Sequence, residues 1–288
     1  MIAAVLALMA STLFGAGDFL AGLASRRTSL PAVIAISQVI GLVLAGTAAP
    51  LLGPAAVTGA DLAWGAVGGI ATIASGFLLF GALARGSMSV VAPITAICAI
   101  TLPVLTGWAL GERLASLRLV GIALALVAVV LIGLEGTDET APAATRRATP
   151  PAALLMALGA GVAIAAFYIC LQRTDPAAGL WPLVATRAVS SVAVTAFWLT
   201  ALGRGRSSVP ARPVILLALA SGTLDIAANL LYLFAVHQGQ LGIVATLASL
   251  YPASTVLLAW LVIGEPIRRV QAAGLATALI AILLITGG

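Results

Sequence analysis

Charged residues are scarce in this sequence. They make up 8% of its 288 residues, whereas about a quarter of a typical soluble domain is charged. Hydrophobic residues make up 62% of the chain, and the mean hydropathy is +1.19. Because a water-soluble fold cannot cover so much apolar surface with so few polar side chains, the composition excludes a soluble enzyme or binding domain.

The chain contains no lysine, one histidine (His237) and two cysteines. Cys98 and Cys170 do not form a Cys-x-x-Cys motif, and neither His-Glu-x-x-His nor a lysine-ending glycine-rich loop occurs. We therefore expect no metal and no cofactor, and interpret both cysteines as small buried residues. The net charge is +5, but the arginines gather in short stretches between apolar runs, so we expect no nucleic-acid partner.

Ten apolar runs divide the chain, and each approaches the ~20 residues that cross a bilayer as a helix. They cover residues 2–24, 30–52, 62–84, 87–110, 118–135, 152–172, 180–202, 213–236, 241–263 and 268–287. We therefore predict an all-α membrane protein with ten transmembrane helices, for which the lipid bilayer is one partner.

The arginines are unequally divided between the two sides of this predicted bundle. Ten lie in the odd-numbered connections and three in the even ones; these are Arg26, Arg27, Arg85, Arg146, Arg147, Arg204, Arg206, Arg212, Arg268 and Arg269, against Arg113, Arg118 and Arg173. Since cytoplasmic loops carry the excess of basic residues, we predict cytoplasmic odd loops and periplasmic termini.

The two halves of the chain resemble each other at an offset of 153 residues. Between residues 84 and 133, thirteen of fifty positions are identical to their counterparts, among them Gly111-Glu112 with Gly264-Glu265. Five helices in each repeat make the second copy enter the membrane from the opposite side, which predicts an inverted-topology pair. We expect a first repeat over 1–135, a polar linker over 136–151 and a second repeat over 152–288.

Two segments carry a family resemblance: "ALARGSMSVVAPITAICAITLPVLTGWALGERL" and "LYPASTVLLAWLVIGEPIRRVQAAGLATALIAILLI". Both resemble the end of an EamA repeat, and the whole chain resembles a ten-helix member of the drug/metabolite transporter superfamily. Among its branches the chain is most similar to the YddG-type amino-acid exporters. One departure is that Phe14-Gly15 stands where the family often has Trp-Gly. The resemblance implies a monomer in a bacterial-type inner membrane that exports small metabolites from a central cavity.

Polar side chains lie on one face of the eighth predicted helix. Asp225, Asn229 and Tyr232 are spaced i, i+4 and i+7, and ionisable residues inside a membrane tend to line pathways. Arg187 lies at a similar depth on the seventh helix, so it can pair with Asp225. Two interpretations stay open: a structural ion pair, or a site where Arg187 holds the carboxylate of a zwitterionic substrate.

A third ionisable residue, Asp18, lies in the stretch "LFGAGDF". It shares a helical face with Ser11 and Gly15, and three roles compete for it: proton carrier, ligand at the cavity mouth, or partner of a loop arginine such as Arg26 or Arg27. The remaining candidates for the cavity wall are Phe14, Gln38, Phe77, Phe167, Tyr168, Thr246 and Ser249.

Two further sets of residues have structural interpretations. Glu112 and Glu265 follow the fourth and ninth helices, where each carboxylate can cap the next helix. Pro93, Pro103 and Pro252 fall inside predicted helices and are candidate bend points.

Taken together, these patterns predict a secondary transporter that exports a small polar metabolite, most simply an amino acid, by alternating access. One alternative is a lipid or drug translocator of the same fold. Another is an intramembrane aspartyl protease that uses Asp18 and Asp225, because "GAGD" spells the Gly-x-Gly-Asp signature. That family's Pro-Ala-Leu element is absent, however, and the order of its two aspartates is reversed. We therefore expect no enzyme activity.

Overall fold

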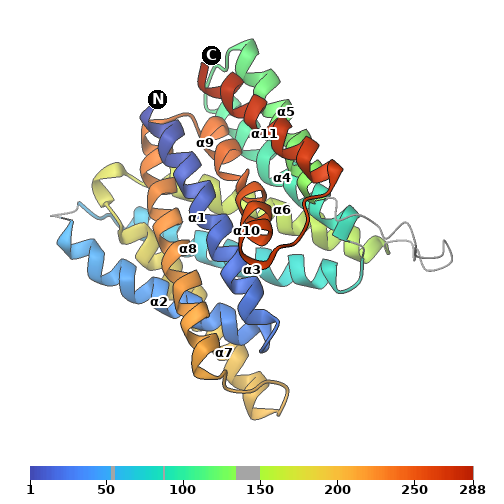
Figure 1. Cartoon of the computed structure of the whole chain (residues 1–288). Helices are drawn as coiled ribbons and strands as arrows, with labels where there is room; N and C mark the ends of the chain where they lie inside the picture. The colour runs from blue at the N-terminus through green and yellow to red at the C-terminus, as the bar shows by residue number, and fades with distance from the viewer. Residues whose placement is uncertain (53–55, 87, 134–149, 288) are drawn as a thin grey trace.

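Eleven α-helices build the part of the chain that the computed structural model describes, residues 1–52, 56–86, 88–133 and 150–287 (Figure 1). A short 3-10 turn, Pro176–Ala178, precedes α7. The helices are α1 (Ile2–Ser25), α2 (Leu30–Leu51), α3 (Gly59–Leu83), α4 (Met88–Ala109), α5 (Ser116–Gly133), α6 (Pro151–Gln172), α7 (Trp181–Gly203), α8 (Arg212–Gln238), α9 (Leu241–Ala248), α10 (Tyr251–Ile263) and α11 (Arg269–Gly287).

These helices provide nine candidate membrane spans and a tenth, shorter apolar helix. Nine stretches of the described chain are long and apolar enough to cross a bilayer, with α9 and α10 together forming one of them. The tenth is α4, which is apolar over Pro93–Ala109. The prediction of an all-α membrane protein is therefore confirmed. The N-terminus and the C-terminus of the chain lie on the same side of the helix bundle (Figure 1).

The ninth predicted helix is not continuous, and in this respect the prediction of one helix over 241–263 was wrong. The helix ends at Ala248 and a new one begins at Tyr251. Pro252 explains the break, because it has no N–H to donate to the carbonyl of Ala248. In contrast, α4 continues through both of its prolines, Pro93 and Pro103.

The helices of the two halves correspond at the offset of 153 residues. Shifted by this offset, α4 falls on α9 and α10 together, and α5 falls on α11. The most extensive packing joins opposite halves: α1 runs along α8, and its counterpart α6 runs along α3. The proposed repeat boundaries stay a prediction, and the linker predicted over 136–151 lies outside the described residues except for Pro150 and Pro151.

Matching glycines bring the last helices of the two halves together. Gly121 of α5 packs against Ile285 of α11, and Gly274 of α11 packs against Ile132 of α5. These pairs are exchanged by the same offset, so the α5–α11 contact is symmetric. Small residues at such crossings allow the two backbones to approach closely, which is a common basis of helix association in membranes.

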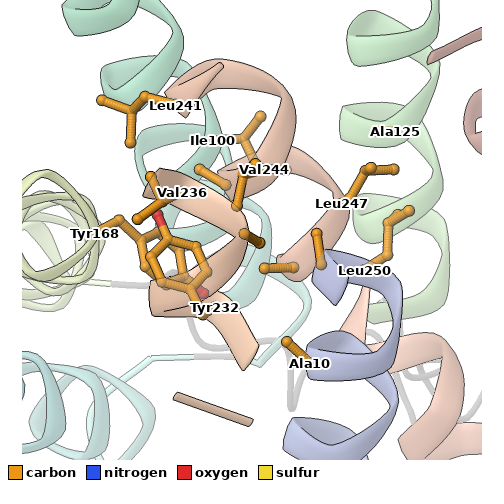
Figure 2. Packing of buried hydrophobic residues seen from close by; sticks show 14 of the residues in the cluster. Ala10, Ile100, Ala125, Tyr168, Tyr232, Val236, Leu241, Val244, Leu247 and Leu250 are labelled. Atoms are coloured by element: carbon orange, nitrogen blue, oxygen red, sulfur yellow. The ribbon is translucent and has the colours of Figure 1, made fainter. Parts of the chain in front are cut away.

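The largest buried apolar cluster surrounds α9. Tyr168 of α6 and Tyr232 of α8 stack with their ring centroids 4.5 Å apart, and Val236, Leu241 and Val244 lie beside them (Figure 2). All residues of α9 except Ile243 are buried. This packing closes the bundle near the face at which α1 begins, which we call the N-terminal face. The face at which α1 ends is called the opposite face.

Candidate functional site

A cavity of about 220 Å³ lies in the middle of the bundle and is lined by helices from both halves. Its wall contains Phe14, Asp18, Gln38, Thr72, Ser75, Ile164, Phe167, Tyr168, Thr186, Arg187, Asp225, Asn229 and Tyr251. Eight of the twelve predicted site residues are among these, so the structure brings most of the candidates together around one space, which we call the central cavity.

The two Nη atoms of Arg187 bind other protein side chains, while its buried Nε has no hydrogen-bond partner in the described chain. Its Nη2 donates to Asp225 Oδ2 and its Nη1 to Gln38 Oε1, each at 2.5 Å. Its side chain is only 4% exposed, against 34% for Asp225. Such a charge-assisted pair is strong and directional. Arg187 is therefore held by protein groups, and its charge is already matched by a carboxylate.

Neighbouring residues fit around this ion pair. Ser190 also donates to Gln38 Oε1, at 3.0 Å. Gly41 of α2 packs against Arg187, where an added Cβ would lie 3.4 Å from Cδ and Nε of the arginine. Thr186 Oγ1 donates to the carbonyl oxygen of Gly65 at 2.8 Å, which ties α7 to α3. The guanidinium of Arg187, on α7, is thus held by contacts with residues of α2 and α8.

Asp225 has partners at both carboxylate oxygens. Arg187 donates to Oδ2, and Asn229 Nδ2 donates to Oδ1 at 3.3 Å. An aspartyl protease requires two carboxylates that share a proton around a water molecule. In this structure each oxygen of Asp225 instead accepts a hydrogen bond from a protein side chain, one of them from a cationic arginine.

Asp18 is arranged differently. Within the described chain its carboxylate takes part in no hydrogen bond and no ion pair, and it lines two cavities at once, the central cavity and an apolar one of about 300 Å³. Arg26, one of the loop arginines considered as its partner, instead forms an ion pair with Glu265 at 3.2 Å. Asp18 thus presents a carboxylate without a protein partner to the space between two cavities.

The other four predicted residues lie outside the central cavity. Tyr232 is fully buried behind Tyr168, and Thr246 is buried within α9, where its hydroxyl donates to the Gly242 carbonyl oxygen. Ser249 lines the apolar cavity beside Asp18. Phe77 lines a third cavity, of about 360 Å³, which reaches the central cavity at Gln38 and Thr72.

Sequence reasoning did not identify five residues of the wall: Thr72, Ser75, Ile164, Thr186 and Tyr251. The repeat offset could have found Thr72, since it is the counterpart of Asp225. Tyr251 faces the cavity because the helix breaks just before it, and a continuous ninth helix would not have indicated this. No sequence signal that we used marks Ser75 or Ile164.

Both additional cavities extend toward the opposite face. The apolar cavity reaches Leu83 and Gly133, which are the last residues of α3 and α5. The third cavity reaches Leu30 and Pro31 at the start of α2. Those helix ends lie where α1 ends, because neighbouring spans are antiparallel. Hollow space lined by the described residues therefore runs from the central cavity toward the opposite face.

At the N-terminal face, the two halves are held together by hydrogen bonds. Glu112 accepts from the backbone N–H of Leu241 at 2.6 Å and of Gly242 at 3.3 Å, so it caps α9. Asp61, which also caps its own helix α3, accepts from the backbone N–H of Asp175 at 2.8 Å. These contacts join residues far apart in sequence and close this side of the cavity.

Glu112 and Glu265 do not cap the helices that follow them in the sequence, so the interpretation that they cap those helices was wrong. Glu112 caps α9, whereas its repeat counterpart Glu265 pairs with Arg26 on the surface. Gly107 leaves room for the Glu112 carboxyl group, and the counterpart of Gly107 is Trp260. A bulky side chain thus stands in the second half where the first half has space.

This difference predicts unequal effects of two matched variants. We expect Glu112→Ala to lower the free energy of unfolding by about 1 kcal/mol, as the loss of a helix cap does. Glu265→Ala should change it by less than about 0.5 kcal/mol, because its ion pair is exposed. Thermal unfolding of both purified variants in one detergent checks this, and equal losses would contradict the assigned contacts.

Comparisons with known proteins agree with this architecture. Residues 151–287 match the model of the EamA-like transporter family, which is just under half of the chain. A solved crystal structure is similar to this chain with a TM-score of 0.77, over 99% of this chain and 96% of its own, at 18% sequence identity. At that identity the likeness shows the fold alone. No curated protein matches the chain in sequence.

Proposed function

We propose that this chain, whose second half carries an EamA-like transporter domain, is a secondary transporter that exports small polar metabolites. The observation that carries the proposal is the central cavity, in which Asp18, Arg187 and Asp225 line one space between helices of both halves. Ionisable residues are expensive inside a membrane and usually mark a substrate or ion pathway. A cavity between inverted repeats is where such carriers bind their cargo.

Alternating access is the proposed mechanism. The hollow space that leads from the central cavity to the opposite face supports a conformation loaded from that side, while the stacked Tyr168 and Tyr232 block the other. The opposite face carries the arginine-rich connections, so we propose that it is cytoplasmic. An exporter in this conformation would take up its substrate from the cytoplasm.

The proposed substrates are small metabolites with an amino group, of which amino acids, the cargo of the YddG-type exporters, are the first to test. Asp18 offers a carboxylate without a protein partner to such an amino group. Arg187 is paired with Asp225, so it would bind a substrate carboxylate only by exchanging partners. The two cavities beside the central one, mainly lined by apolar residues, favour substrates with an apolar part and keep a drug or lipid translocator as the second candidate.

An uptake panel in liposomes tests this function. Purified protein is reconstituted, and uptake of one labelled amino acid is measured with unlabelled amino acids, amines and organic anions as competitors. We expect uptake several-fold above that of protein-free vesicles, with competition by compounds that carry an amino group. Uptake no greater than in protein-free vesicles would reject the amino-acid class, and movement of a labelled phospholipid instead would favour the translocator.

A further inference from the structure

The charges around the central cavity are unevenly matched. Among the described residues, Arg187 is the only basic one in its wall, and it is paired with Asp225. Asp18 is the remaining charged group in that wall, and in the described chain it has no hydrogen bond or ion pair. A carboxylate in an apolar environment is costly unless a cation or a proton accompanies it. The cavity is therefore built to accept a positive charge rather than a negative one.

Aromatic rings surround the position of Asp18. Phe14 of α1 and Tyr251 of α10 lie edge to face with their ring centroids 6.5 Å apart, and Phe167 and Tyr168 line the same cavity. Aromatic faces attract cations, and the attraction grows where water is excluded. An ammonium group beside Asp18 would thus be favoured by both the carboxylate and the rings.

The apolar cavity begins at the same residues. Asp18, Ile164 and Tyr251 line both this cavity and the central one. Its other walls include Leu79, Val129, Ile132 and Val256, which offer apolar contacts to an apolar body. At about 300 Å³ it has the size of a small-ligand pocket. A molecule with its charge at Asp18 can place its apolar body in this second space.

We infer that Asp18 binds the ammonium group of a monocationic amine, whose apolar body occupies the cavity bounded by Leu79, Val129 and Val256. This inference rests on the proposed transport function and narrows its substrate class. A zwitterionic amino acid also brings a carboxylate, and the one basic residue in the described part of the wall, Arg187, is already paired with Asp225. Amines without a carboxylate should therefore bind more tightly than the matching amino acids.

Three probes with the same phenyl ring separate the charge types: phenethylamine is cationic, phenylalanine zwitterionic and 3-phenylpropionate anionic. Binding to the purified full-length protein is measured by isothermal titration calorimetry at pH 7, with protein-free micelles as the blank. We expect phenethylamine to bind at least tenfold more tightly than phenylalanine, and 3-phenylpropionate to bind least. Equal or tighter binding of phenylalanine would overturn the inference while leaving amino-acid export intact.

Variants of α1 test the assigned group. Asp18→Asn should weaken phenethylamine binding at least tenfold, whereas Asp18→Glu, which keeps the charge, should retain much of it. Thr12→Ala is the matched control, because the Thr12 hydroxyl bonds only to the Leu8 carbonyl of its own helix. Unchanged affinity of a folded Asp18→Asn protein, or no binding of phenethylamine by the wild type, would reject the site. The liposome panel decides separately whether the protein transports amino acids.

Discussion

Asp225→Leu should lower the free energy of unfolding by about 3 kcal/mol, the lower end of the loss that removing one partner of a buried ion pair causes, because Asp225 itself is 34% exposed. The variant leaves the Arg187 guanidinium with Gln38 as its one remaining acceptor, in a side chain that is 4% exposed. The guanidinium would then be a nearly buried charge that has lost its counter-ion. Thermal unfolding in detergent, followed by circular dichroism, measures the loss.

The partner variant and the double variant are the controls. Arg187→Met leaves Asp225, which is 34% exposed to the cavity, so we expect a smaller loss of about 1–3 kcal/mol. With both charges removed, Asp225→Leu/Arg187→Met should be within about 1 kcal/mol of the wild type, because an apolar pair can replace a buried ion pair. A double variant as unstable as the sum of the two single losses would show that the residues do not act as a pair.

Gly69→Ala should also be strongly destabilising, by about 1–3 kcal/mol or more. Gly69 of α3 faces α7 so closely that an added Cβ would lie 2.6 Å from the Thr186 carbonyl oxygen and 2.9 Å from the Cβ of Val189. The nearer atom belongs to the backbone, so the clash can be relieved only by moving a helix. The hydrogen bond from Thr186 to Gly65 in the same contact would be strained as well.

Gly76, on the same helix, provides the matched control. No atom lies within 4 Å of a Cβ added there, so Gly76→Ala should leave stability unchanged or raise it slightly, since alanine favours a helix over glycine. Unfolding temperatures of the two variants are compared in the same detergent. Similar temperatures for both variants would mean that α3 and α7 do not pack as closely as the structure places them.

Which residues line the cavity could be predicted only in part. Asp225 and Asn229 lie on one helical face by their spacing, and Arg187 was placed at a matching depth, so their meeting could be predicted. The sequence could not predict whether Arg187 is paired or available to a substrate. That depends on the positions of Gln38 and Asp225, which lie on two other helices. Tyr232 shares the predicted helical face but stacks against Tyr168 outside the cavity. The spacing of residues on one face of a helix does not show how far along that face the cavity extends.

The sequence by itself determined that the protein is an all-helical, multi-pass membrane protein, and it gave the offset at which the helices of the two halves correspond, because apolar run length and repeated spacing are properties of the chain alone. It did not determine the break at Ser249–Leu250, nor the unequal roles of Glu112 and Glu265, nor the position of Asp18 between two cavities. These three features depend on which helices of the first half pack against helices of the second half. The contacts of α1 with α8, α9 and α10 are an example, because they join segments that are far apart in the sequence. Only the tertiary structure shows that Arg187 already has a partner while Asp18 does not.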